Sequence, residues 1–397
     1  MIVFEFKVKG KSSQYLAIDD AIRTSQFIHN KCIRQWMDRK GVSKNELSKY
    51  TKILAKQFPF AKNLNAMSRQ AAAERAWSSI SHFYDNCKKG IKPVGYPKFK
   101  KNSRSVEYKT QCWKLLSPKY IQFKEFGTLK LIGTYDLAFY RVELIKRVRV
   151  VRRADGYYVQ FCIKIDVSEE VEPSRCAIGL DVGLEYFYTD SDGNHLENPR
   201  FYRKAEKRRS QLNRRFSRTQ KGSKNRAKAR KRLAKLDLKI SRQRVEHAKR
   251  LARCVILSND VVAYEDLKVT NMVRNHNLAK SISDAGWYQF RSWLEYFGRK
   301  FGKITIAVAP HFTSQECSSC GRTVKKSLST RTHKCVCGCK LQRDHNAALN
   351  ILKKGLGTVG HTGTSVRLRS LSVAKLNASG ETTSFLIDSG QSKKVGS

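Results

Sequence analysis

Residues 177–194, AIGLDVGLEYFYTDSDGN, decide the fold of the second half of the chain. Their apolar and aromatic runs predict a buried strand and a return strand, with a turn at Asp192-Gly193. The buried strand contains a carboxylate, Asp181. An unpaired carboxylate costs several kcal/mol there, so it persists mainly where a cation or a buried partner compensates for it. The stretch therefore predicts the start of a sheet and a metal ligand, Asp181, within it.

Strands and helices alternate downstream of this stretch. VVAYEDL (261–267) and KITIAVAP (303–310) predict strands, while WYQFRSWLEYFGRKFG (287–302) and DHNAALNILKKGL (344–356) predict helices. A cysteine-rich segment interrupts the series before the last helix. This alternation suits an α/β sheet with a small insert, and together with the opening hairpin it predicts an RNase H-like domain that begins near Pro173.

Two further carboxylates accompany Asp181. Glu265 ends the strand VVAYE, and Asp344 opens the last predicted helix. Hard oxygen ligands suit Mg²⁺ or Mn²⁺, and two such ions about 4 Å apart activate a water and stabilise the leaving 3′ oxygen of a phosphodiester. The three acids thus predict a two-metal nuclease site. In the alternative, Asp181 caps a turn, Glu265 pairs with a lysine and Asp344 caps its helix. Neighbouring acids in turns, on the opposite strand face or before a helix are left out: Asp190, Asp192, Asp266 and Asp284.

Five of the eleven cysteines lie in one short segment: Cys317, Cys320, Cys335, Cys337 and Cys339. Metal binding explains such a cluster better than disulfides do. Cys317 and Cys320 form a CxxC knuckle, and Cys335 and Cys337 form a second pair, so four thiolates predict a structural zinc. The second pair is one residue short of CxxC. Cys339 is therefore an alternative fourth ligand, and His333 is another.

The N-terminal part has a different pattern. MIVFEFKVKG alternates apolar and polar residues like a strand, and residues 14–90 carry apolar residues at helical spacing. After a basic loop punctuated by Gly and Pro, alternating segments predict antiparallel strands. We expect a small β-barrel interrupted by a helical insert. An apolar stripe on the first helix is expected to be core: Ile18, Ile22, Phe27, Ile28 and Ile33.

The charge of the chain indicates its partner. Lys and Arg number 79 against 33 Asp and Glu, a formal net charge of +46, and such self-repulsion is costly without a polyanion. Hydrophobic residues make up 40% of the chain, so most of it should fold. Residues 202–253 predict basic helices, broken at KGSKN, that contact phosphates. Their apolar face is narrow: Leu233, Leu236, Ile240 and Val245.

Aromatic and basic residues interleave in the loop YPKFKK, at Tyr96, Lys98, Phe99 and Lys100. Tyr108 and Trp113 follow closely. The pattern suits base stacking with phosphate contact, and burial of the rings in the core is an equally good interpretation.

The sequence predicts no membrane span and no signal peptide, and its C-terminal tail carries no predicted chemistry. No run approaches the about 20 apolar residues of a membrane span, and the N-terminus does not resemble a signal peptide. We expect a cytoplasmic, nucleoid-associated, prokaryotic protein. From Gly357 onward the sequence is rich in Gly, Ser and Thr, which predicts a disordered tail.

With these residues in view, the chain resembles the TnpB family, the transposon-encoded, IS200/IS605-like OrfB proteins that are RNA-guided nucleases and relatives of the type V CRISPR effectors. The resemblance runs from the N-terminus to about Leu356. It rests on segments that follow the family's order: GYPKFKK (95–101), GLDVGLEYF (179–187), RRFSRTQKGSKNRAKARKRLAKL (214–236), YEDLKVTNM (264–272), SISDAGWYQF (281–290), TSQECSSCG (313–321) and QRDHNAALNI (342–351).

The resemblance implies roles for these residues. Asp181, Glu265 and Asp344 would be RuvC catalytic acids that hold magnesium, and zinc would be held by Cys317, Cys320, Cys335 and Cys337. It also implies a guide RNA from the transposon end, double-stranded target DNA cut beside a short flanking motif, and one protein copy in the ribonucleoprotein. The loop near Lys98 is a candidate for contact with that motif.

The resemblance further implies an α+β multidomain architecture. A wedge-like β-barrel (1–12 and 115–172) would be interrupted by a helical recognition domain (13–114). The RuvC-like nuclease domain would follow in two pieces (173–312 and 343–356) around a zinc ribbon (313–342), with the tail at 357–397.

Two departures and two alternatives accompany the family assignment. The family usually has an acid where Gln342 stands, and the second cysteine knuckle is short. An RNA-guided repressor that no longer cuts would typically have lost one of the three acids, and all three are present. A strand-joining transposase would use similar metals, but the cysteine ribbon between the second and third acids favours the nuclease.

Overall fold

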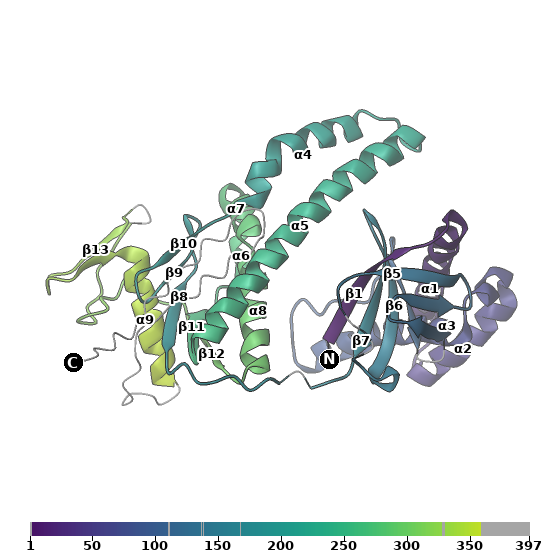
Figure 1. Cartoon of the computed structure of the whole chain (residues 1–397), viewed down its shortest axis with the longest axis horizontal. Coiled ribbons are helices and arrows are strands. Elements are labelled where there is room, and N and C mark those ends of the chain that lie inside the picture. Colours follow the sequence, from purple (N-terminus) through teal and green to yellow (C-terminus); the bar gives the residue numbers. More distant parts are fainter. Residues whose placement is uncertain are drawn as a thin grey trace, which may run out of the picture. The chain divides into compact units, whose positions relative to one another are not determined.

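The computed structural model describes residues 2–109, 112–135, 137, 139–166, 168–327 and 330–358. The chain forms two compact units that divide between residues 167 and 168 (Figure 1). None of the helices in these ranges combines the length and the apolar character that a membrane span needs.

The first unit contains a seven-stranded antiparallel sheet in the order β2-β6-β7-β1-β5-β4-β3. Its strands are β1 Ile2–Lys9, β2 Ser105–Lys109, β3 Trp113–Ser117, β4 Tyr120–Phe123, β5 Gly127–Ile132, β6 Ile145–Arg153 and β7 Gly156–Ile163, with a 3-10 turn η3 at Val142–Leu144. β1 lies inside the sheet and pairs with β7 on one side and β5 on the other. The predicted N-terminal strand and the antiparallel strands are confirmed.

The prediction of a closed β-barrel is wrong. Among the described residues, β2 pairs only with β6 and β3 only with β4, so no ladder joins the two edges of the sheet. Because just three residues separate these edge strands in sequence, their ends lie within about 15 Å of each other. The sheet therefore curls strongly without closing. Both β2 and the first residues of β3 belong to this sheet, although the sequence placed them in the helical domain.

The predicted helices of this unit are α1 Ser12–Asp38, α2 Lys44–Gln57 and α3 Ala66–Lys88, with a 3-10 turn η1 at Pro59–Asn63. The Ser43 and Glu46 side chains form a reciprocal capping box that begins α2. The predicted stripe on α1 is core: Ile18, Ile22, Ile28 and Ile33 are buried, and Phe27 packs half-buried beside them. One hydrophobic core is thus shared by the helices and the sheet.

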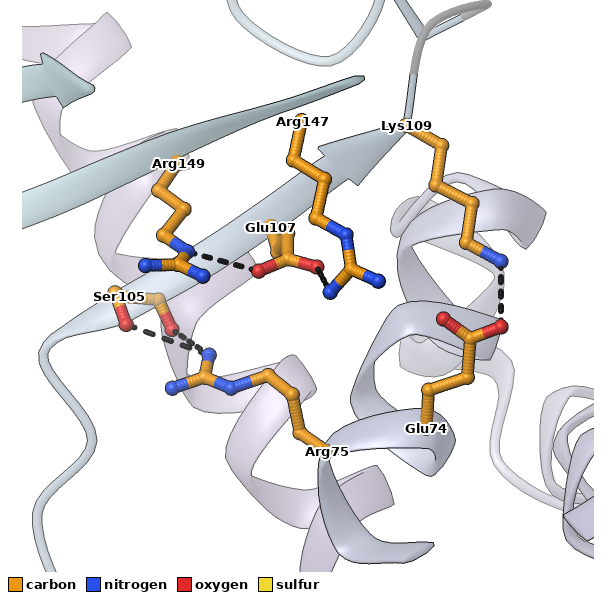
Figure 2. A network of polar contacts seen from close by, with 7 residues as sticks. All are labelled: Glu74, Arg75, Ser105, Glu107, Lys109, Arg147 and Arg149. Atoms are coloured by element: carbon orange, nitrogen blue, oxygen red, sulfur yellow. Dashed lines mark hydrogen bonds and ion pairs between the residues drawn. The ribbon is translucent and has the colours of Figure 1, made fainter. Parts of the chain in front are cut away.

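A polar network joins α3 to the edge strand β2 (Figure 2). The Glu107 side chain, 2% exposed, accepts hydrogen bonds from Arg147 (3.0 Å) and Arg149 (2.9 Å) of β6. Arg75 of α3 donates to the backbone carbonyl of Ser105 (3.4 Å). Each buried carboxylate oxygen of Glu107 thereby has a charged partner, which offsets the cost of its burial.

The second unit contains a five-stranded sheet in the order β10-β9-β8-β11-β12. Its strands are β8 Ala177–Asp181, β9 Tyr186–Asp190, β10 His195–Glu197, β11 Val261–Glu265 and β12 Ile304–Val308. β8, β11 and β12 run parallel, whereas β9 and β10 pair antiparallel. The predicted opening hairpin and the two predicted downstream strands are confirmed.

Helices cover both faces of this sheet. α5 (Lys224–Ser258) and α8 (Trp287–Lys300) pack on one face, and α9 (Arg343–Thr358) packs on the other. A Cβ at Gly179 would lie 2.2 Å from the backbone oxygen of Ala348, so only glycine lets α9 approach β8 this closely. The result is a three-layer α/β/α arrangement around the central strands.

A long basic helical hairpin extends from this unit (Figure 1). It consists of α4 (Phe201–Ser217), which buries no residue, and α5, whose first turn is capped by the Ser223 hydroxyl. Of the four residues predicted for its apolar face, Ile240 alone is buried and the others are half-buried. The core-facing part of α5 lies nearer its C-terminal end: Ala248, Leu251, Ala252, Val255 and Ile256.

Short elements complete the unit. They are α6 Val269–Met272, α7 His276–Ala285 and the hairpin of β13 Thr332–Lys334 with β14 Lys340–Gln342. α9 includes the first two residues of the predicted tail, 357 and 358, which are therefore helical. Residues 359–397 lie outside the described residues, and the disordered tail stays a prediction for them.

Candidate active site and metal centre

The strand register brings Asp181 and Glu265 together. Leu180 of β8 and Tyr264 of β11 are parallel partners, so the next residues, Asp181 and Glu265, lie side by side where the two strands end. Leu180 and Tyr264 point into the core beneath α5 and α8. Because side chains alternate along a strand, Asp181 and Glu265 point to the opposite face, which α9 covers.

Asp344 reaches the same place from α9. It lies in the first turn of this helix and is 8% exposed, and the Arg343 Nε donates to its Oδ1 at 3.0 Å. The close packing of α9 on β8 at Gly179 sets the position of that first turn. The structure thus brings the three predicted acids from two strand ends and one helix to the same face of the sheet, near enough for their charges to interact, but their oxygens do not all lie within 4.8 Å of one another.

The electrostatics of these groups reflect their proximity. Burial raises the pKa of the Asp181 carboxyl well above its ordinary value, and the charges of Glu265 and Asp344 raise it further, against a smaller lowering by Arg343. Burial also raises the pKa of Glu265, opposed by a hydrogen bond from the Thr313 hydroxyl. Three carboxylates in a poorly solvated site repel one another, and a divalent cation would relieve that repulsion.

The neighbouring acids that we did not assign to the metal site form structural hydrogen bonds and ion pairs. Asp190 accepts hydrogen bonds from the backbone N–H groups of Asp192 (3.0 Å) and Asn194 (2.9 Å) and so shapes the hairpin turn. Asp266 forms an ion pair with Arg291.

Asp284, at the end of α7, caps a different helix. Its carboxylate accepts from the backbone N–H groups of Tyr202 (2.8 Å) and Arg203 (3.2 Å) at the start of α4, where Arg200 provides no side-chain cap. A carboxylate at a helix N-terminus stabilises the exposed N–H groups. Asp284 therefore anchors the basic helical hairpin.

Four cysteine sulfurs form a compact cluster. The metal-ligating atoms of Cys317, Cys320, Cys335 and Cys337 all lie within 4.8 Å of one another. The Sγ atoms of Cys317 and Cys337 are 3.7 Å apart, and those of Cys320 and Cys335 are 3.5 Å apart. Tetrahedral Zn–S bonds of about 2.3 Å place sulfurs roughly 3.8 Å apart, so the cluster fits zinc.

Cys339 and His333 belong to a second grouping with Cys317. Burial opposes ionisation of the Cys317 thiol, but the backbone N–H of Cys320 and the His333 ring outweigh it and lower its pKa to about 5. His333 is buried in the ribbon. The grouping around Cys337 contains four thiols and the grouping around Cys339 contains two, so the former offers the fuller ligand set.

Two asparagines of α9 hold the first knuckle. Asn346 donates to the backbone oxygen of Glu316 (2.7 Å) and accepts from the N–H of Ser318 (3.0 Å), and Asn350 donates to the carbonyls of Thr313 and Glu316 (both 2.8 Å). Both asparagines are buried. The sequence analysis missed them, as it missed Thr313, because nothing in their local pattern separates them from ordinary helix or loop residues.

The predicted basic loop is exposed on one side, and residues of α1 contact its other side. Tyr96 and Phe99 are 52% and 45% exposed, and the Tyr96 ring lies 5.5 Å from the Trp36 ring. The backbone of Lys100 exchanges two hydrogen bonds of 2.9 Å with the Asn30 side chain. Lys98 is exposed.

Tyr108 and Trp113 are buried in the core. The stacking interpretation is therefore wrong for these two rings.

Two family models match the chain. A family described as "Probable transposase" (OrfB_IS605) matches residues 160–276, which include Asp181 and Glu265. A "Cas12f1-like, TNB domain" matches residues 287–351, which include Asp344 and the five clustered cysteines.

Curated relatives agree with these matches. A "Putative RNA-guided DNA endonuclease" of Streptomyces pristinaespiralis is 35% identical over 206 residues, which cover 51% of this chain and 51% of that protein. The "Putative RNA-guided DNA endonuclease InsQ" of Escherichia coli (strain K12) is 29% identical over 286 residues, covering 66% of this chain and 69% of that one. The chain thus spans about half the length of the Streptomyces relative.

Solved structures show the same fold. The Cas12f1-sgRNA-target DNA complex has a TM-score of 0.55 at 15% identity, covering 86% of this chain and 83% of that chain. The mini-RNA-guided endonuclease CRISPR-Cas_phi3 has a TM-score of 0.53 at 10% identity, covering 93% of each chain. The mixed α/β fold is therefore that of the Cas12 effectors. The fold alone does not distinguish among these nucleases, but the family models and the curated relatives do. They confirm the predicted resemblance to the TnpB family.

Proposed function

We propose that this protein is an RNA-guided DNA endonuclease of a transposable element, and that it cuts target DNA beside a short flanking motif. The observation that carries the proposal is the placement of Asp181 and Glu265 at neighbouring strand ends, on the face to which α9 brings Asp344. Phosphodiester hydrolysis requires few other protein groups once the metal ligands are in place.

The three acids would hold Mg²⁺ or Mn²⁺, which when bound supplies an activated water and charge stabilisation for the leaving oxygen. The Thr313 hydroxyl hydrogen-bonds Glu265 and orients its carboxylate. Arg343 does the same for Asp344. Such partners of ligand residues fix their direction before an ion arrives.

Zinc would be structural in the cysteine cluster. Cys317, Cys320, Cys335 and Cys337 supply four thiolates and leave no open position for a substrate. Since Asn346 and Asn350 connect this cluster to α9, the ribbon would steady the helix that carries Asp344.

The proposed partners are a guide RNA from the transposon end and double-stranded target DNA. The net charge of +46 and the exposed cations of α4 and α5 support a polyanionic partner. The names of the relatives, and the sgRNA and target DNA bound in the Cas12f1 complex, support an RNA-guided mode. In that mode base pairing supplies most of the specificity.

The description "Probable transposase" of the matching family model keeps a strand-joining enzyme as the second candidate. A repressor that binds RNA without cutting is the third. Neither explains three intact acids next to a cysteine ribbon as simply as a nuclease does.

The test is to purify the protein from cells that carry its transposon end, sequence the bound RNA, and incubate the complex with a matching plasmid library and Mg²⁺. Guided cutting that is lost in Asp181→Ala supports the nuclease and reveals the flanking motif. Bound RNA without cutting points to the repressor, and joined strands without bound RNA point to the transposase.

A further inference from the structure

The turn at residues 190–194, DSDGN, lies next to the start of α9. It joins β9 to β10, and the Asp190 carboxylate closes it by accepting from two backbone N–H groups of the turn. The nuclease proposal gives this turn no role. The turn nevertheless contacts both the strand that carries Asp181 and the helix that carries Asp344, so it connects two of the three acids.

Ser191 attaches this turn to β8. Its backbone N–H donates to the carbonyl of Gly179 (3.0 Å), and its hydroxyl accepts from the N–H of Gly179 (3.1 Å). Ser191 is 3% exposed, so water competes little for these two hydrogen bonds. Gly179 lies two residues before Asp181 on β8. The pair of hydrogen bonds therefore fixes the turn to the strand that carries this acid.

His345 attaches the same turn to α9. Its ring Nε2 lies 3.2 Å from the carbonyl oxygen of Ser191. Because a carbonyl oxygen only accepts hydrogen bonds, this nitrogen must carry the hydrogen, and His345 is the donor. His345 directly follows Asp344 in the first turn of α9. The hydrogen bond therefore restrains the part of the helix that carries this acid.

Gly193 leaves room for the His345 ring. Its φ is +87°, and a Cβ at this position would lie 3.1 Å from Cε1 of His345. That separation is shorter than an ordinary carbon–carbon contact, so a side chain here would press the ring away from Ser191. The Asp-Gly sequence of the turn thus allows the contact with α9 as well as the turn itself.

The first turn of α9 is thereby fixed in two directions. Asn346 binds the first cysteine knuckle, and His345 binds the DSDGN turn. Consecutive residues of a helix point about 100° apart, so these two contacts oppose rotation of the helix as well as sliding along its axis. Side chains, and not only the backbone packing of α9 on β8, consequently set the position of Asp344.

A metal site gains from this restraint. The three acids repel one another, and their oxygens do not all lie within 4.8 Å of one another, so an ion has to draw them together. We propose that His345 is a positioning residue of the acid site, which through Ser191 holds Asp344 where it and Asp181 can bind one divalent cation. This rests on the proposed nuclease function.

The test is a Mn²⁺ titration of the full chain, with zinc in the ribbon and no nucleic acid, followed by electron paramagnetic resonance. Asp181→Asn is the blank for ions bound elsewhere. His345→Ala should raise the Kd of the acid site for Mn²⁺ about tenfold, as the loss of a residue that orients a metal ligand does. His345→Gln, whose amide can donate to the same carbonyl, should restore the wild-type Kd. Thr358→Ala, which removes a 3.0 Å hydrogen bond at the far end of α9, is the matched control and should leave the Kd unchanged.

A double-mutant cycle shows whether His345 acts through Asp344. In the Asp344→Asn background, His345→Ala should raise the Kd no further, because the carboxylate that it positions is gone. A merely structural His345 would lower the thermal midpoint in EDTA without changing the Kd at a temperature where both proteins are folded. An unchanged Kd in His345→Ala, or an equal rise in the Asp344→Asn background, overturns the proposal.

The same titration separates this proposal from the nuclease proposal. If the wild type binds Mn²⁺ no better than Asp181→Asn does, the acids hold no metal ion and both proposals fail together. If the wild type binds Mn²⁺ and His345→Ala binds it equally well, the positioning role fails alone.

A cleavage assay with guide RNA and target DNA gives a second readout. His345→Ala should need about tenfold more Mg²⁺ for half-maximal cutting, while its KM for the target stays at the wild-type value. A raised KM with an unchanged Mg²⁺ requirement would mean that His345 contacts the DNA, and it would overturn the positioning role.

Discussion

The buried side-chain amide of Asn346 accepts a hydrogen bond from the backbone N–H of Ser318 at 3.0 Å, between the two cysteines of the first knuckle. Asn346 lies two residues after Asp344 on α9. The cysteine cluster and the acid site therefore share one helix. A substitution that loosens the cysteine cluster should also shift the position of Asp344.

Asn346→Ala should lower the free energy of unfolding by about 2 kcal/mol, because it removes one of the two donors to the Glu316 carbonyl and leaves the N–H of Ser318 without its acceptor. It should also release zinc at a lower chelator concentration and slow DNA cleavage. Denaturant unfolding, a zinc-release assay and a cleavage assay measure the three effects. Asn277→Ala, at an exposed position of α7, is the control and should change none of them. Unchanged zinc retention in Asn346→Ala would contradict the link.

The fourth zinc ligand can be assigned by a matched pair of variants. Cys337→Ser should lower the zinc content of the purified protein and the thermal midpoint, because Cys337 completes the four-sulfur cluster. Cys339→Ser should retain zinc. Metal analysis of both proteins decides between them, and the opposite pattern would assign the role to Cys339.

Neutralising Asp181 should separate stability from activity. Burial and the neighbouring carboxylates raise the pKa of Asp181 in the folded chain, so the folded state binds this proton more tightly than the unfolded state does. The contribution of Asp181 to stability is therefore full below the ordinary aspartate pKa and falls as pH rises toward the raised value. With EDTA at neutral pH, Asp181→Asn should have a higher thermal midpoint than the wild type.

The same variant should cut DNA about 10³-fold more slowly with Mg²⁺ present, because it removes a metal ligand. Thermal unfolding in EDTA at pH 5 and pH 7 and a cleavage time course test both statements. A lower midpoint for Asp181→Asn at pH 7 without metal would show that the carboxylate is compensated within the protein.

The Glu107 network should matter more than an exposed ion pair. Glu107→Gln should lower the free energy of unfolding by about 1–2 kcal/mol, because one arginine loses its acceptor to an NH₂ group and the other keeps only a neutral acceptor, while Arg147 and Arg149 stay partly solvated. Asp20→Asn breaks the ion pair with Arg23, in which both side chains are at least 67% exposed. The loss in the free energy of unfolding should be less than about 0.5 kcal/mol, because exposed ion pairs usually contribute only about 0.2–1 kcal/mol. Equal losses in the two variants would show that burial of Glu107 adds nothing.

The sequence predicted most reliably those features that depend on residues close together in the chain. Alternation and apolar runs located the strands that end in Asp181 and Glu265, and cysteine spacing located the knuckles. The tertiary features were harder to anticipate. Closure of the first sheet depends on whether two edge strands meet, and nothing in either strand encodes that.

Burial of single residues was similarly ambiguous in the sequence. Tyr108 and Phe99 each adjoin a lysine in the sequence, yet one is core and the other is exposed, because the strand β2 turns Tyr108 inward. Asn346 and Asn350 look like ordinary polar helix residues until the ribbon folds back onto them. Partners distant in sequence decide such positions, so a linear pattern does not reveal them.

The order of the acids along the chain has a consequence for synthesis. Asp181 and Glu265 leave the ribosome well before Asp344, and α9, which covers their face of the sheet, is translated after both. A nascent chain consequently displays an apolar sheet face, formed by Ala177, Val261, Ala263 and Ile306, until this helix emerges. The proposed acid site is thus incomplete during translation, and chaperones that bind exposed apolar surface would meet this protein at that stage.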